Sequence, residues 1–249
     1  MNPALREFAH RPWPMPHGRW VMAQVWHDLL FAHWPVDGDK LRGLLPRGLE
    51  LDTFRGQAWI ALVPFRMSGV RLRHTIAVPR MSSFPELNVR TYVVRDGKPG
   101  VWFFSLDAAS AVAVEVARTW FHLPYFRARM KCVRTGEGIV YSSERRDPRG
   151  RQGVLRMTYS PAGAAFSATR GSLEHFLTER YCLYAQDARG SLYRSEIHHP
   201  PWQLQLAETG FTENSMLAAD GLETPAGAPL LHFSRRQDVV VWPLQLLTS

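Results

Sequence analysis

Cysteine, lysine and long apolar runs are scarce in this 249-residue chain. The two cysteines, Cys132 and Cys182, lie in unrelated segments and form no CxxC pair, which argues against a disulfide framework and suits a reducing cytoplasm. No run of about 18 apolar residues occurs, so we expect no membrane span. The first 18 residues lack the apolar core of a signal peptide, and we therefore expect a cytoplasmic protein.

Motifs of several common enzyme classes are also missing. GxSxG, P-loop and GxGxxG patterns do not occur, so the hydrolase, nucleoside triphosphatase and dinucleotide-binding classes have no support. HExxH and the Cys/His spacings of zinc sites are absent as well. The sequence therefore predicts no cofactor and no metal.

The basic charge of the chain has an unusual composition. The formal net charge is +8, yet 27 of the 30 basic residues are arginines and only Lys40, Lys98 and Lys131 are lysines. The arginines are scattered in short pairs and form no dense run. Although a basic protein can bind nucleic acid, this scatter indicates a general arginine bias more than a phosphate-binding surface. We expect no nucleic-acid partner, and the oligomeric state stays open, a homo-oligomer included.

Strand patterns dominate the chain after an extended arm at residues 1–18. Residues 20–34 are apolar and aromatic, and predict either a strand pair or one long buried strand. A hairpin is predicted where two β-branched runs flank Asp96-Gly97, and a second one turns through Gly136-Glu137-Gly138. "GVLRMTYSPAG" and "AAFSATRG" predict two further strands, and a strand pair joined across residues 187–190 follows a short helix capped by Ser172.

One strong helix is predicted over residues 107–122, with Asp107 as its N-cap and Pro124 ending it. Its pattern places Glu115, Arg118 and His122 on one narrow polar stripe, so the helix should be buried on most sides.

About ten strands against three or four helices, without βαβ alternation, predict a mainly antiparallel α+β fold, a bent sheet or β-barrel with packed helices. Residues 19–249 should form a single domain.

Several polar residues are candidates for chemistry, each with a structural alternative. Glu86 opens an apolar strand, where it could be a buried acid/base or could pair with an arginine. Arg118 could hold a substrate carboxylate with two hydrogen bonds, or could pair with Glu115 in its own helix. His198 and His199 point to opposite faces of a strand, so one of them could face a site, or both could simply close a strand end before two prolines.

A family resemblance rests on strings spread from about Trp20 to Leu244. The chain resembles the YqjF-like family of conserved uncharacterised proteins, through "LLFAHWPV", "LDTFRGQAWIALVPFRM", "FPELNVRTYV", "GVWFFSLDAAS", "LPYFRARM", "LEHFLTERYCLY", "EIHHPPWQLQ" and "DVVVWPL". More distantly, its order of elements is similar to acetoacetate decarboxylase, which implies that superfamily's β-barrel around a pocket.

This resemblance implies which residues form a site, and it also excludes the Schiff-base reaction of the decarboxylase. Glu86 matches the decarboxylase's active-site glutamate and Arg118 its helix arginine, while Tyr125 takes the place of the lysine that forms a Schiff base. Tyrosine has no amine, so iminium chemistry cannot occur at this position, and Lys131 is six residues further along.

We therefore name Glu86, Arg118 and Tyr125 as candidate catalytic residues, and as candidate substrate-binding residues His122, Phe126, Glu115 and His198. The expected ligand is a small anionic or carbonyl-bearing metabolite, handled without a covalent step. A ligand-binding module without catalysis and an arginine-mediated nucleic-acid or anionic-surface binder are the alternatives.

Overall fold

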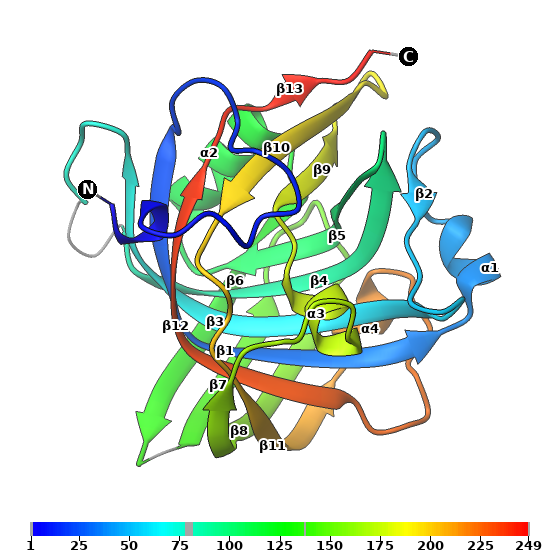
Figure 1. Cartoon of the computed structure of the whole chain (residues 1–249). Helices are drawn as coiled ribbons and strands as arrows, with labels where there is room; N and C mark the ends of the chain where they lie inside the picture. The colour runs from blue at the N-terminus through cyan, green and yellow to red at the C-terminus, as the bar shows by residue number, and fades with distance from the viewer. Residues whose placement is uncertain (1, 78–81, 137, 249) are drawn as a thin grey trace.

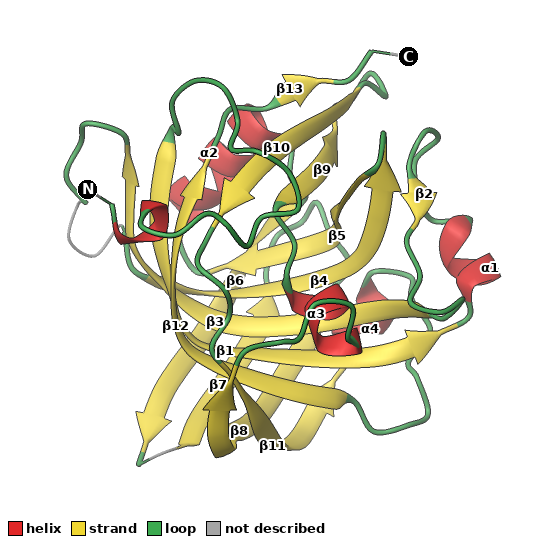
Figure 2. Cartoon of the chain, viewed as in Figure 1, coloured by secondary structure: helices red, strands yellow, loops and turns green. Residues whose placement is uncertain are grey.

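The computed structural model of the chain describes residues 2–77, 82–136 and 138–248, and most of them are in strands (Figures 1 and 2). The strands are β1 (Met22–Val36), β2 (Glu50–Leu51), β3 (Ala58–Leu72), β4 (Phe84–Arg95), β5 (Lys98–Ala108), β6 (Tyr125–Thr135), β7 (Gly138–Arg145), β8 (Val154–Phe166), β9 (Cys182–Gln186), β10 (Leu192–His198), β11 (Leu204–Asn214), β12 (Leu230–Val241) and β13 (Gln245–Leu246). The helices are the 3-10 turn η1 (Pro3–Leu5), α1 (Gly38–Arg42), α2 (Ala111–Phe121), α3 (Leu173–Thr178) and α4 (Met216–Ala219).

All thirteen strands of the described residues belong to one strongly bent sheet. Its order is β13-β10-β9-β5-β6-β7-β8-β11-β12-β1-β3-β4-β2, with additional pairings β4–β5 and β10–β12. These two pairings join strands that are distant in that order, so the sheet returns on itself (Figure 1). Only β5–β6 and β5–β9 are parallel. The predicted mainly antiparallel α+β fold with a bent sheet is therefore confirmed.

Two hairpins and a long strand follow the sequence pattern. Asp96 and Gly97 both have positive φ, 53° and 69°, as the two-residue turn between β4 and β5 requires. β6 and β7 form the second predicted hairpin, although Glu137 of its turn lies outside the described residues. Residues 22–36 form one strand rather than a pair, with a register shift after His27 and a positive φ at Asp28. β8 is likewise a single strand where two were predicted.

The predicted start of helix α2 is wrong. Strand β5 continues through Ala108, and the helix begins only after Ser110, whose side chain accepts a hydrogen bond from the Ala113 N–H. Asp107, the predicted N-cap, is instead buried in β5 and pairs with Arg145 at 2.7 Å. A buried arginine supplies a stronger partner than a helix N-terminus, and this long-range pair is invisible in the local sequence.

The predicted burial of α2 is also wrong. Val112, Val116 and Trp120 are 55%, 38% and 57% exposed, while Val114 and Phe121 pack inward. The helix therefore lies on the sheet by one face only. Its C-terminus does follow the prediction, because His122 adopts the left-handed conformation at φ 50° just before Leu123 and Pro124.

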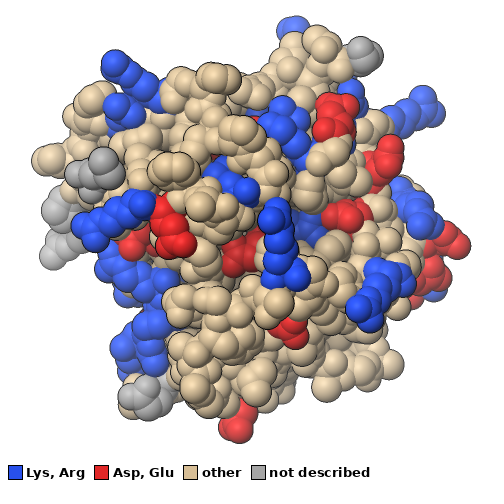
Figure 3. Space-filling model, viewed as in Figure 1, with Lys and Arg blue, Asp and Glu red and all other residues tan. Residues whose placement is uncertain are grey.

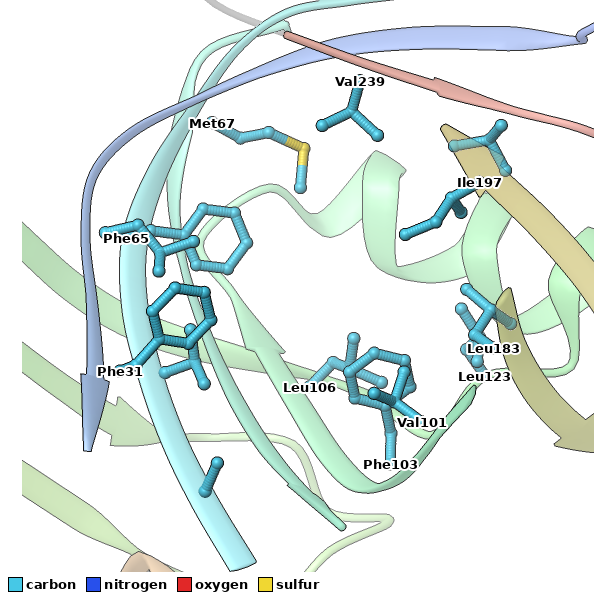
Figure 4. Close-up of a cluster of buried hydrophobic side chains, with 14 of the residues drawn as sticks. Phe31, Phe65, Met67, Val101, Phe103, Leu106, Leu123, Leu183, Ile197 and Val239 are labelled. Atoms are coloured by element: carbon cyan, nitrogen blue, oxygen red, sulfur yellow. The ribbon is translucent and has the colours of Figure 1, made fainter. Parts of the chain in front are cut away.

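Alternation along the strands divides the apolar side chains between two cores. In β3, Ala61, Val63, Phe65 and Met67 point into one core, and Ile60 and Leu62 point into the other. The first core is drawn in Figure 4, where Phe65, Met67, Phe103, Leu123 and Ile197 point inward from different strands and from the segment after α2. The site lies in this first core.

An N-terminal arm closes over β10. Arg11 is buried and donates to the Glu196 carboxylate at 2.9 Å and to the Ile197 carbonyl at 2.7 Å. Trp13 and Lys98 donate to the same carboxylate. The arm is therefore fixed to the sheet by a buried ion pair. Within the described residues, no helix has both the length and the apolar character needed to cross a membrane.

Candidate functional site

A cavity of about 100 Å³ lies inside the first core, bounded by β1, β3, β4, β5, α2 and the β9–β10 side of the sheet. Aromatic and aliphatic side chains form most of its wall, including Trp26, Phe65, Phe103 and Trp202. A recess of about 80 Å³ adjoins it and shares Glu86, Tyr125 and five other lining residues. Enclosed apolar cavities with a few polar groups are the usual form of small-molecule sites.

A larger, open cleft of about 570 Å³ lies between α1 and residues 221–228. Its ionisable lining residues, Asp37, Lys40 and Glu223, are all exposed, and Lys40 pairs with Glu223 at 2.7 Å. Such a surface pair has its charges solvated and offers little chemistry. The smaller cavity is the stronger candidate because it holds deeply buried ionisable groups.

Strand β4 supplies the polar side of the cavity. Glu86, Asn88 and Arg90 are each at most 8% exposed and all line it, while the intervening Leu87 and Val89 belong to the second core. Residues at i, i+2 and i+4 of a strand share one face. In a strand with one face in solvent, the polar residues point outward. In "ELNVR" the polar residues instead face the interior of the bent sheet.

Glu86 and Tyr125 form a hydrogen-bonded pair in the cavity wall. The Tyr125 hydroxyl donates to Glu86 Oε2 at 3.0 Å, and both side chains are buried. Tyr125 is the first residue of β6, held in register by the parallel pairing of Leu106 with Tyr125. The Tyr141 hydroxyl donates to the Glu86 backbone carbonyl at 2.6 Å, which fixes the strand at this position.

Burial changes the proton affinity of both groups. The pKa of Glu86 is raised to about 8, because desolvation outweighs the stabilising hydrogen bond from Tyr125. The pKa of Tyr125 is raised well above its ordinary value, by burial and by the neighbouring Glu86. At neutral pH the carboxyl is therefore mostly a neutral acid that can be ionised at modest cost. An acid/base with a pKa near the working pH is best suited to proton transfer.

Arg118 does not have the position expected of an anion holder. Its Nη1 donates to the Tyr125 backbone carbonyl at 2.8 Å, and its guanidinium lies over the Phe126 ring at 5.7 Å. Neither Arg118 nor Phe126 lines the cavity. Phe126 follows Tyr125 directly in β6, and strand alternation turns its side chain to the opposite face of the sheet. Arg118 instead supports the backbone that carries the Tyr125 side chain.

The other predicted substrate-binding residues also lie outside the cavity. Glu115 is exposed and pairs with Arg149 at 2.8 Å, so the intrahelical pair with Arg118 does not form. His122 packs on the Tyr193 ring with the ring centroids 4.9 Å apart. His198 Nε2 is bonded to the Glu7 carbonyl at 2.9 Å, on the arm side of β10.

His199, and not His198, lines the cavity. It is 1% exposed, and burial lowers its pKa to about 4, so the ring is neutral at physiological pH. Its neighbours include the Trp202 ring, with centroids 5.2 Å apart. The sequence could not choose between the two histidines because the choice depends on how β10 packs against the arm.

Five polar lining residues were not found from the sequence: Gln24, Asn88, Arg90, Thr178 and Arg180. The alternation with Glu86 could have identified Asn88 and Arg90. Thr178 and Arg180 lie at the end of α3, far from β4 in the chain, and no local pattern marks them.

None of the three lysines of the chain reaches this cavity. Lys40 pairs with Glu223 on the surface, Lys98 pairs with Glu196 at 2.6 Å, and Lys131 is exposed on β6. The cavity accordingly contains no amine for a Schiff base.

On the molecular face in Figure 3, basic and acidic side chains are interspersed and no extended basic stripe is visible. Arginines outside the cavity also form ion pairs with acidic side chains, for example Arg156 with Glu213 and Arg236 with Asp238.

Solved structures define the class of fold to which this arrangement belongs. The acetoacetate decarboxylase of Legionella pneumophila superposes with a TM-score of 0.65 at 12% identity, covering 96% of this chain and 93% of that one. The enduracididine biosynthesis enzyme MppR, complexed with pyruvate, gives 0.64 at 14% identity, with 93% and 92% covered. The chain therefore has the acetoacetate decarboxylase-like fold.

Sequence comparison places the chain within that class. It belongs to the DUF2071 family of uncharacterized conserved proteins, whose model matches residues 23–238. The uncharacterized protein YqjF of Bacillus subtilis (strain 168) is 48% identical over 231 residues, covering 93% of this chain and 94% of that protein. The resemblance stated from the sequence is confirmed.

Proposed function

We propose that the protein binds a small carbonyl compound in the Glu86 cavity and that Glu86 exchanges a proton with it, without a covalent intermediate. The observation that carries this proposal is the buried Glu86–Tyr125 pair, 3.0 Å apart, in the wall of a largely apolar cavity. Fold similarity alone would not support it, because one fold hosts many functions.

The chemistry follows from the proton affinity of Glu86. With a pKa of about 8, roughly one-tenth of the carboxyl is ionised at pH 7. That carboxylate accepts a proton from the carbon next to the ligand's carbonyl, the C–H electrons form the enol double bond, and the carbonyl electrons move to oxygen. Return of the proton to carbon regenerates the ligand. The Tyr125 hydroxyl fixes the orientation of the carboxyl throughout.

Proton exchange into pyruvate tests this proposal. Pyruvate fits a cavity of this size, and it is the ligand of the similar MppR structure. In D₂O, we expect the protein to accelerate loss of the methyl proton signal, followed by NMR, with a rate that rises with pH to a midpoint near 8. Glu86→Gln should lower the rate about 100-fold or more.

The matched control is Glu208→Gln, which removes an exposed strand carboxylate that does not line the cavity. This variant should exchange protons at the wild-type rate. Saturable pyruvate binding with no exchange above buffer would refute catalysis and assign the cavity to ligand binding alone. An unchanged rate in Glu86→Gln would refute the role of that carboxyl.

A further inference from the structure

Two buried arginines lie at the end of the cavity away from the Glu86–Tyr125 pair. Arg90 and Arg180 both line it and are 8% and 4% exposed. Their guanidinium carbons lie 5.7 and 4.8 Å from the centroid of the same Tyr92 ring, so both groups pack against one side chain. Glu86 and Arg90 are four residues apart on one face of β4, which separates their Cα atoms by about 13 Å.

Both arginines have N–H groups without a partner among the described residues. Arg90 Nε and Arg180 Nη2 are buried and make no hydrogen bond within the protein. The indole N–H of Trp202, which also lines the cavity, is in the same condition. A buried polar group normally has a partner, so three unpartnered donors around one cavity indicate a ligand with several acceptor atoms.

The protein balances only part of the positive charge at this end. Arg180 pairs with Asp52 at 2.6 Å, but Arg90 forms no ion pair with any carboxylate of the described residues. Its polar contacts are a long hydrogen bond to the Leu177 carbonyl, 3.4 Å, and a contact with the Tyr92 hydroxyl, neither of which carries a full negative charge. The nearby Glu179 accepts from Trp202 N and from the Tyr181 hydroxyl instead. Burying an unpaired charge is unfavourable, and an anionic ligand would relieve it.

We propose that Arg90, Arg180 and Trp202 form a carboxylate subsite, and that the protein's ligand is a short oxo acid spanning the cavity. The carboxylate is held by the guanidinium donors, and the carbonyl lies toward Glu86 and Tyr125. The assignment of the carbonyl end rests on the proposed function, whereas the carboxylate end rests on the arginines alone. The cavity of about 100 Å³ and the adjoining recess of about 80 Å³ are comparable in size with the roughly 150 Å³ cavity that holds benzene, which favours a ligand of a few heavy atoms.

Pyruvate and its neutral isostere pyruvamide distinguish this subsite from a generally polar cavity. Isothermal titration calorimetry should give tighter binding of pyruvate than of pyruvamide by the wild-type protein. Arg90→Met keeps an unbranched apolar stem but removes the charge and the donors, and should weaken pyruvate binding about tenfold to a hundredfold without weakening that of pyruvamide. Arg90→Lys, which keeps the charge, should give an intermediate affinity.

Arg129→Met is the matched control, because Arg129 is exposed on β6 and does not line the cavity. It removes the same charge and should leave both affinities unchanged. Circular dichroism and thermal unfolding test whether Arg90→Met is folded. Trp202→Phe offers a second test of the subsite, because it removes only the indole donor.

Three results would overturn the carboxylate subsite. The first is equal affinities of the wild-type protein for pyruvate and pyruvamide, and the second is the absence of pyruvate binding. The third is an equal pyruvate affinity of the wild type and of folded Arg90→Met. The proposed function can fail separately. Arg90-dependent pyruvate binding without proton exchange would refute catalysis by Glu86 and would leave the carboxylate subsite standing.

Discussion

Replacing Glu86 with glutamine should change how the stability of the protein depends on pH. The folded carboxyl keeps its proton up to about pH 8, whereas the unfolded one loses it near pH 4.5. Between these values the unfolded state binds fewer protons, so raising the pH favours unfolding. Each pH unit in this window costs about 1.4 kcal/mol of stability. From pH 4.5 to pH 7 the loss reaches about 3 kcal/mol, and above pH 8 it levels off.

Glutamine cannot ionise but keeps the shape of the side chain and an oxygen that can accept from Tyr125. Relative to the wild type, Glu86→Gln should therefore gain about 3 kcal/mol between pH 4.5 and pH 7. Urea unfolding at several pH values, followed through the fluorescence of the nine tryptophans, measures the difference. The exposed Glu208→Gln serves as the control for general charge effects. Parallel pH profiles of wild type and Glu86→Gln would refute the raised pKa of Glu86.

Three further predictions follow from other contacts. Tyr125→Phe removes the hydrogen bond that stabilises the Glu86 carboxylate, so the pKa of Glu86, measured by NMR titration, should rise above 8; a fall would contradict the pairing. Arg145→Met leaves the buried carboxylates of Asp107 and Asp220 without their shared partner and should lower the free energy of unfolding in urea by about 3–5 kcal/mol; a neutral effect would refute that network. Gly100→Ala would place a Cβ atom 2.7 Å from both the carbonyl oxygen and Sγ of Cys182, and we expect a thermal unfolding midpoint lowered by an amount equivalent to about 1–3 kcal/mol; unchanged stability would show that this contact can relax.

Local sequence patterns predicted the turns and the helix ends that depend on a few neighbouring residues. The Asp96-Gly97 turn, the short helix after Ser172 and the end of α2 near Pro124 all follow from backbone preferences of a few residues. The start of α2 did not follow, because Asp107 is drawn into β5 by Arg145, which lies 38 residues further along the chain. Pairings of this kind depend on the assembled sheet.

The residues of the candidate site could also be predicted only in part. Glu86 and Tyr125 could be named from the family resemblance, and the structure brings their side chains within 3.0 Å of each other. Arg118 was named on the same grounds, yet its guanidinium faces the Tyr125 carbonyl and the Phe126 ring. The position of a long side chain depends on its neighbours in space.

Arg90 lines the cavity but was not named from the sequence. The alternation from Glu86 to Arg90 was readable in the sequence, but a basic residue in a strand is normally expected to face solvent. Only the closure of the sheet turns this face inward. Arg180 enters the cavity from the end of α3, and its proximity to Arg90 is set entirely by tertiary packing.

The ionisation of Glu86 is the most direct test of its proposed role as an acid/base. Carbon-13 NMR of protein labelled in its glutamate carboxyl groups, with the Glu86 resonance identified by its loss in Glu86→Gln, would follow this group through a pH titration. We predict a transition near pH 8, at which the carboxyl can act as an acid/base at physiological pH in a largely apolar cavity. A transition near the ordinary value for glutamate, about 4.3, would contradict the account, because the group would then be a permanently charged carboxylate.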